Sequence, residues 1–423
     1  MIDRQAPSSY KFVVMKEPTH KRGVVLVVFL TMFLDLVGFG IIIPIQPFFT
    51  ENFGASPTVI TLLGGSYSLM QFIFVPLWGR LSDRIGRRPV MLTSIAITAL
   101  GYVLFATATR IEMLFAARMI AGFGAANIAT SQAVMADIST AENRAKAMGL
   151  VGAAFGLGFV FGPAIGGLLG QISPQTPIWV AAALSAVNFL CAVFLLPETL
   201  DTTKRAKREL NLVKVFARVS QRVNVTPLLV TTLVITAGFS LMEQVLGLFI
   251  EHTWVTHSGE VSRDVAFEQA AGLTAIVLVV IGIVMSLVQG RYIGRLVTRY
   301  GEKRLLLAGA LGNVVVLALI PTTAWLGFEA LLVVAVLMGI FSGLWSPSLQ
   351  AILSRSVEVD EQGSTMGLNH SMGSLGRTLG PACAGLLYEM GRPVPFWVGG
   401  GIILLTLLIL RNVQPSSKAK STQ

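Results

Sequence analysis

Apolar residues in this chain gather in long runs and do not show the short alternation that is typical of half-buried strands. A run of about 20 apolar residues is long enough to cross a bilayer as an α-helix. Such runs predict twelve transmembrane helices, over residues 23–45, 58–79, 89–109, 112–136, 146–170, 177–196, 227–250, 270–290, 303–323, 328–353, 364–388 and 394–411. The pattern therefore predicts an all-α membrane protein.

Two polar motifs occur twice, in the same order, at similar distances. GRLSDRIGRR at 79–88 returns as GRLVTRYGEK at 294–303, and GLGFVFGPAIGG at 156–167 returns as SLGRTLGPACAG at 374–385. A repeat of this length predicts two pseudo-symmetric six-helix halves, and transporters place their substrate sites between such repeats. We therefore expect a cytoplasmic N-terminus (1–22), a first half (23–196), a linker (197–226), a second half (227–411) and a cytoplasmic tail (412–423).

The distribution of charge predicts the orientation. Only 13% of the residues are charged, about half the fraction usual in a soluble domain. Of the 32 Lys and Arg residues, 27 fall on the side of the membrane that holds both termini, whereas the opposite loops hold only Arg110, Arg263 and Arg392. By the positive-inside rule both termini are cytoplasmic. The net charge of +10 is therefore an orientation signal, and no nucleic-acid partner is expected.

Other classes of function lack their sequence signals. Cys191 and Cys383 lie in apolar segments, without disulfide or metal spacing. No phosphate-binding GxxxxGK[ST] loop and no hydrolase constellation occurs, so we expect neither an enzyme nor a cofactor, and not ATP as the driving force. The basic residues of the linker fit a solvated tether that fixes topology or, alternatively, an amphipathic helix on the inner leaflet: Lys204, Arg205, Lys207, Arg208, Lys214, Arg218 and Arg222.

Several motifs together resemble one known family. The repeated GxLxDRxGRR and GxxxGPxxGG patterns, with RMIAGFGAA at 118–126, resemble the major facilitator superfamily and its twelve-helix drug–proton antiporters. LDLVGFGIIIPIQP (34–47), SDRIGRRPV (82–90) and ISPQTP (172–177) resemble bacterial tetracycline efflux proteins. The resemblance implies a monomer of the bacterial inner membrane that exports small lipophilic molecules by alternating access. Its implied partners are the substrate, protons and membrane lipids.

Away from their ends, the predicted transmembrane helices hold four charged residues: Asp35, Arg118, Glu243 and Arg377. A charge at the centre of a membrane helix costs roughly 2.5–3.5 kcal/mol on insertion scales, so it usually faces a cavity or a partner. Asp35, about 18 Å along its helix and so near mid-bilayer, fits a proton carrier or substrate-binding acid, with a structural ion pair as the alternative.

The other three charges leave alternatives open. Arg118 cannot release a proton, so it would tune a neighbouring carboxylate or bind an anionic group; Ala335 stands at the matching position of the second half. Glu243 would be a second proton or cation site, or a partner of Arg377. Arg377 would hold a salt bridge or an anionic headgroup.

The loop motif at 79–88 predicts a gate. Gly79 and Gly86 would allow a tight turn, and Asp83 would accept hydrogen bonds from arginine or from a helix N-terminus to form a latch. The motif's arginines would also hold the loop to phospholipid, or would only fix topology: Arg80, Arg84, Arg87 and Arg88. The second copy has Thr298 in place of Asp83, and a topology signal needs no aspartate, which favours the gate.

The motif at 156–167 places Gly158, Gly162 and Gly166 on one helix face, followed by Gly167, so that another helix can approach closely. Pro163 removes a backbone donor from this helix. In the family this pattern is typical of antiporters, and it therefore favours export.

The substrate is less sharply predicted. This chain has Gly101 and Asn313 where tetracycline exporters carry further acids, so the tetracycline chelate is not expected as the main substrate. We expect lipophilic molecules, with cations held by Asp35 and Glu243. The alternatives are a lipid or glycolipid flippase that uses Arg118 and Arg377 for an anionic headgroup, and a receptor or scaffold that transports nothing.

Overall fold

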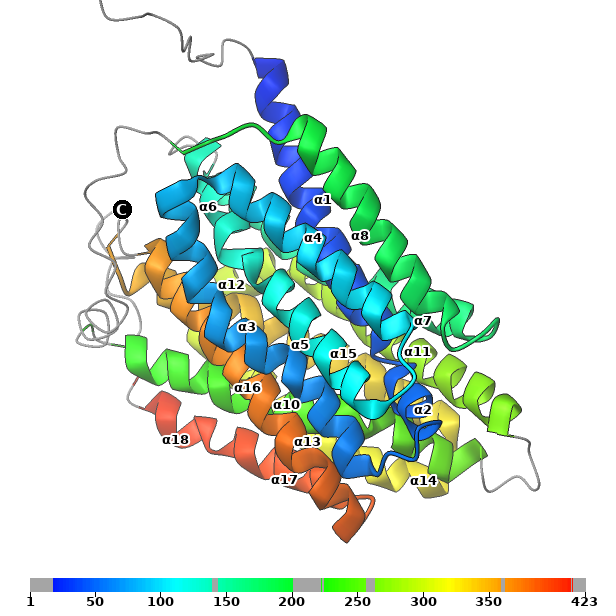
Figure 1. Cartoon of the computed structure of the whole chain (residues 1–423). Coiled ribbons are helices and arrows are strands. Elements are labelled where there is room, and N and C mark those ends of the chain that lie inside the picture. Colours follow the sequence, from blue (N-terminus) through cyan, green and yellow to red (C-terminus); the bar gives the residue numbers. More distant parts are fainter. Residues whose placement is uncertain are drawn as a thin grey trace, which may run out of the picture.

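The computed structural model describes residues 18–138, 144–200, 222, 224–255, 263–358, 362–411 and 413. These residues form helices joined by short connections, with no strand among them (Figure 1). Most of the basic linker falls outside the described residues, so the choice between a tether and an amphipathic helix stays a prediction.

The two halves are built from consecutive helices. The first half contains α1 (Pro18–Ile42), α2 (Gln46–Glu51), α3 (Pro57–Ile85), α4 (Arg87–Ala106), α5 (Ile111–Gly124), η1 (Ala125–Asn127), α6 (Ile128–Ile138), α7 (Arg144–Gly170) and α8 (Thr176–Leu195). The second half contains α10 (Val225–Ile250), η3 (Glu251–Val255), α11 (Arg263–Leu287), η5 (Val288–Tyr292), α12 (Ile293–Tyr300), α13 (Glu302–Leu319), η6 (Ile320–Thr322), α14 (Thr323–Leu326), α15 (Phe328–Arg355), α16 (Gln362–Met390), α17 (Val394–Leu404) and α18 (Thr406–Arg411).

The helices follow the predicted apolar runs. Ten helical segments of the described chain are long and apolar enough to cross a membrane. The two remaining predicted runs correspond to α7 and α16, the helices that carry the repeated glycine-rich motif. The main difference is in the second half, where the predicted span 270–290 continues through η5 into α12 and ends only at Gly301.

Each half has its own apolar core. The largest buried cluster lies mainly within the second half and includes Phe249 and Phe396, whose rings pack 5.1 Å apart. The first half has a separate cluster around Phe49 and Phe105, with centroids 5.7 Å apart. Apolar packing therefore holds each half together on its own, and buried polar contacts such as Thr31 with Asn188 and Ser342 with Asn313 lie within single halves.

Two helix pairs join the halves. α3 packs along α16, where Gly65 lies against Pro381, and α7 packs along α11. At the end of α3 that begins with Pro57, Thr58 donates a hydrogen bond through Oγ1 to the Glu389 carboxylate at 2.9 Å. Nearer the opposite end of the bundle, Gln132 on α6 and His370 on α16 form a hydrogen bond of 2.8 Å. Side chains of both halves therefore meet near both ends of the interface.

Candidate functional site between the two halves

Asp35 lies in the second half of α1, two turns before its end, and is only 8% exposed. Its carboxylate accepts a hydrogen bond from Asn127, with Nδ2 3.0 Å from Oδ2. The same amide donates to Ser94 Oγ at 3.0 Å. Within the described part of the chain no cationic side chain forms an ion pair with Asp35. The carboxylate is therefore held by a neutral amide, and it can gain or lose a proton without breaking an ion pair.

The position of Asn127 follows from a break in the fourth transmembrane segment. The η1 turn interrupts this segment between α5 and α6. Just before the turn, a Cβ on Gly122 would meet the backbone of Tyr67, and one on Gly124 would meet Thr98. These close approaches set α5 tightly against α3 and α4, and η1 then presents Asn127 to α1. Asn127 was not predicted from the sequence, although the glycine-rich stretch before it was a usable signal.

Arg118 contacts aromatic rings and no carboxylate. It is 3% exposed, and its guanidinium carbon lies 4.6 Å from the centre of the Tyr67 ring and 5.9 Å from that of Phe39. The guanidinium atoms Nε and Nη1 are buried and have no hydrogen-bond partner among the described residues. Direct contact with a carboxylate, one of the two predicted roles of Arg118, is therefore not present in this structure.

Glu243 and Arg377 lie on α10 and α16, two helices that pack together. Glu243 is 6% exposed and interacts electrostatically with Arg377. Arg377 donates through Nη2 to Ser374 Oγ at 3.2 Å. The two charged side chains form no direct ion pair in the described structure.

All four intramembrane charges converge on one region. Tyr67 interacts electrostatically with Asp35, Arg118 and Arg377, and Arg377 interacts with Glu243. Residues from both halves therefore share one polar region in an otherwise apolar interior. No group of three or more metal-ligating side chains occurs among the described residues.

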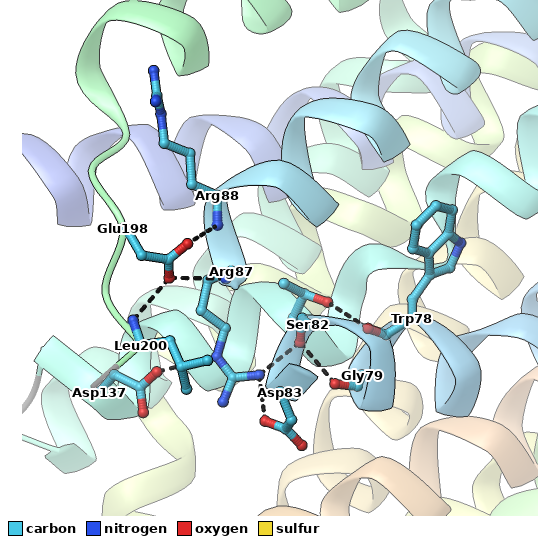
Figure 2. Close-up of polar contacts among 10 residues, drawn as sticks. Trp78, Gly79, Ser82, Asp83, Arg87, Arg88, Asp137, Glu198 and Leu200 are labelled. Carbon is cyan, nitrogen blue, oxygen red and sulfur yellow. Dashed lines mark hydrogen bonds and ion pairs between the residues drawn. The ribbon is translucent and has the colours of Figure 1, made fainter. Parts of the chain in front are cut away.

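The loop motif forms a second polar cluster, inside the first half (Figure 2). The Arg87 guanidinium pairs with Asp83 at 2.6 Å and with Asp137 of α6 at 3.2 Å, and it donates to Ser82 Oγ at 2.6 Å. The Arg87 side chain is 4% exposed. The predicted phospholipid contact is therefore wrong for Arg87, because its charge is already neutralised inside the protein.

Glu198 closes this cluster from the end of α8. Its carboxylate accepts hydrogen bonds from the backbone N–H groups of Arg87 at 2.9 Å and Arg88 at 3.3 Å, which begin α4 (Figure 2). Gly86 adopts φ +115°, and a Cβ there would collide with the Glu198 carboxylate. Arg88 is partly exposed and donates to the Val193 carbonyl at 2.8 Å, and its contact with lipid stays a prediction.

The remaining motif residues divide in the same way. Gly79 lies inside α3 and faces Ala129 of α6, so the predicted turn at Gly79 is wrong and only Gly86 forms it. Arg84 is exposed and Arg80 is partly exposed, so both stay available to lipid. Glu198 and Asp137 were missed because nothing in the local sequence connects them to this loop.

The second copy of the loop has a different electrostatic design. Thr298 donates to the Arg295 carbonyl of its own helix, and a Cβ on Gly301 would have nothing within 4 Å among the described residues. Glu302 stands where Arg87 stands in the first half and pairs with Arg355, at the end of α15, at 2.6 Å. The two halves thus keep an ion pair between corresponding helix ends, with the signs reversed.

The glycines of α7 pack the helix that carries Asp35. Cβ atoms on Gly158, Gly162 and Gly166 would meet Leu36, Gly40 and Ile41 of α1. Gly167 faces the other way, toward Ala275 of α11. The helix continues through Pro163. The motif therefore fits α7 between α1 and the second half.

Known proteins resemble this chain over most of its length. A family model of the Major Facilitator Superfamily matches residues 28–293 and 268–423. The chain belongs to the Major Facilitator Superfamily. Among its relatives, the class C tetracycline resistance protein of Escherichia coli is 33% identical over 402 residues, covering 93% of this chain and 97% of the relative. Multidrug resistance protein 2 of Bacillus subtilis (strain 168) is 30% identical over 404 residues, covering 93% and 96%.

A solved structure has the same overall fold as this chain. The crystal structure of the human organic anion transporter MFSD10 superposes with a TM-score of 0.70 at 25% identity, covering 93% of this chain and all of that one. The predicted family and the predicted helical fold are thus confirmed. The chain is therefore a multi-pass membrane protein of a transporter superfamily, and relatives of it are tetracycline and multidrug resistance proteins.

Proposed function

We propose that this protein exports lipophilic small molecules from the cytoplasm in exchange for protons that move inward. The observation that carries the proposal is Asp35, a buried carboxyl group near the meeting plane of the halves, held by Asn127 and not neutralised by an ion pair. Such a group can gain and lose a proton without breaking a salt bridge. The drug-efflux relatives support the export of small molecules.

The cycle follows from alternating access. With the site open to the cytoplasm and Asp35 ionised, the substrate enters from the cytoplasm or the inner leaflet. The halves then rock about α3–α16 and α7–α11 and expose the substrate on the other side. Proton binding at Asp35, with Glu243 as a second site, promotes release and returns the carrier.

The same proposal fixes the setting. The protein lies in a bacterial-type inner membrane as a monomer with both termini cytoplasmic, since the basic residues gather on that side. The loop around Asp83 acts as a gate, because its ion pairs link the ends of α3, α4 and α6 into one rigid unit.

Transport by purified protein in liposomes tests the proposal. A panel of labelled lipophilic compounds is offered with and without an imposed pH gradient, and protein-free liposomes are the control. We expect at least one compound to move against its gradient only when the pH gradient is present. Transport that ignores the pH gradient would contradict proton exchange, and the absence of any transport across the panel would favour the receptor or scaffold.

A further inference from the structure

We propose that the site between the halves binds an anionic group of an amphipathic substrate, such as a carboxylate, sulfonate or phosphate, between Arg118 and Arg377. This inference rests on the proposed export function and adds the substrate class. It opposes the expectation from the sequence that the substrates are cations.

The placement of the two arginines comes from the packing of α3. Gly122 of α5 lies against the backbone of Tyr67, and Pro381 of α16 lies against Gly65, two residues earlier on α3. α3 is thus held between α5, which carries Arg118, and α16, which carries Arg377. Both guanidinium groups interact electrostatically with Tyr67. The two cations therefore flank the same side chain from opposite halves of the protein.

Arg118 has donors to offer. It is 3% exposed, and in the part of the chain that the structure describes nothing accepts a hydrogen bond from its Nε or Nη1. The Tyr67 ring at 4.6 Å stabilises the cation through its face but accepts no hydrogen bond from these atoms. Buried guanidinium donors without partners are costly, and an oxyanion is the acceptor that suits them best. The free edge of Arg118 is therefore a recognition element.

Arg377 also has hydrogen-bond donors available for a ligand. Its Nη2 donates a hydrogen bond to Ser374, one turn earlier on its own helix. The Glu243 carboxylate interacts electrostatically with Arg377, but the two side chains form no ion pair in the described structure. The arginine is only partly buried although it lies in a transmembrane helix. Its guanidinium group is therefore open to a ligand.

The acids do not neutralise this pair of arginines directly. Asp35 accepts its hydrogen bond from Asn127, and neither arginine contacts it. A cation placed between two guanidinium groups would be repelled, whereas an oxyanion would gain charge-assisted hydrogen bonds from both halves. Proton binding at Asp35 and anion binding at the arginines use separate groups, so conformation couples them.

Two sources of the anion share this chemistry: a drug-like organic anion or the headgroup of an anionic lipid. A matched series separates charge from shape, namely radiolabelled naphthoate, its neutral naphthamide and (naphthylmethyl)ammonium. Fluorescently labelled phosphatidylglycerol, with labelled phosphatidylcholine as its control, tests the lipid source. Saturable binding is measured on the purified wild-type protein, and transport or flipping is measured in liposomes.

Substitutions at the site give the discriminating result. We expect R377Q to weaken binding of the anion about tenfold and to leave the naphthamide nearly unchanged, with R377K keeping part of the affinity because a single ammonium replaces the fork of donors. R118Q should have a similar effect. The matched control is R392Q. It changes an exposed arginine just after α16, which donates to the His252 carbonyl, and it should leave anion binding unchanged.

Glu243 gives a test of opposite sign. If the site binds anions, E243Q removes a competitor for Arg377 and tightens anion binding. If the site binds cations, E243Q weakens cation binding. Size-exclusion profiles verify folding, and the R377K and E243Q proteins carry the test if R118Q does not purify as a single species.

Each outcome decides. Arginine-dependent binding of naphthoate supports an organic anion, and arginine-dependent flipping of phosphatidylglycerol supports a lipid source. The inference is overturned if wild-type protein binds neither anion, or if R377Q and R118Q bind them normally. Proton-driven transport of the ammonium compound alone would overturn this inference and leave the export function standing. Arginine-dependent anion binding without any proton-driven transport would support this inference and contradict the proposed export function.

Discussion

The side-chain amide of Asn127 donates a hydrogen bond to the Asp35 carboxylate, 3.0 Å from Nδ2 to Oδ2, across two transmembrane segments of the first half. The bond connects the proposed proton site to η1, the turn that interrupts the fourth segment. Rearrangement of this turn would therefore change the environment of Asp35 at once.

Removing this amide should impair transport. A hydrogen bond to a charged group contributes about 1.5 kcal/mol or more, so N127A should change the proton-driven transport rate about tenfold. The matched control is N188A, which removes the bond from Thr31 Oγ1 to Asn188 one turn earlier on α1. Both proteins should lose some thermal stability, but only N127A should lose transport. Equal transport by the two variants would remove Asn127 from the mechanism.

The loop of the first half should matter more than its copy. D83N takes one partner from the buried Arg87 guanidinium, whereas T298A removes a hydrogen bond within a single exposed helix. We expect D83N to slow turnover with substrate binding nearly intact, since an imbalance of about 1.4 kcal/mol between two conformations shifts their ratio tenfold. T298A should have little effect. Turnover and binding measured side by side test this, and equal losses would reduce the motif to a topology signal.

Glu198 should stabilise the start of α4. Its carboxylate caps two backbone N–H groups at the positive end of that helix, so E198A should cost about 1–2 kcal/mol of stability. E112A changes an exposed acid in the first turn of α5 that makes no capping bond, and it should cost less. Thermal unfolding in detergent compares the two proteins. A smaller loss for E198A than for E112A would argue against the cap.

The contact between α1 and α7 should not tolerate a side chain. A Cβ on Gly162 would lie 2.7 Å from the Gly40 Cα atom, between two helix backbones that have little room to move. G162A should destabilise the protein by about 1–3 kcal/mol, as overpacking does. G401A, at a helical glycine with nothing within 4 Å, is the control and should be neutral. A G162A protein with wild-type stability and transport would show that the helices separate easily.

The sequence was informative where its signal is local. Long apolar runs and the repeated motifs predicted the helices, and charges such as Asp35 and Arg377 stood out because they are rare inside membranes. The family resemblance rested on these same motifs.

The contacts that these residues make with distant parts of the chain could not be predicted from the sequence. Asn127 and Glu198 are ordinary polar residues whose roles appear only when distant helices pack together. The aromatic contact of Arg118 and the inward position of Arg87 likewise depend on side-chain packing that periodicity does not encode. The misplaced turn at Gly79 shows that a glycine on its own does not define a helix end.

The most direct test of proton-coupled export is proton movement itself. Purified protein is placed in liposomes with a pH-sensitive dye inside, and a transported compound is added to start exchange. Wild-type protein should move protons when substrate moves, and D35N should purify as a folded protein because removing a membrane-embedded charge lowers the insertion cost. We predict that D35N shows no substrate-driven proton signal, with E243Q as the comparison at the second acid. An undiminished signal from D35N would contradict the account and assign the proton to another group.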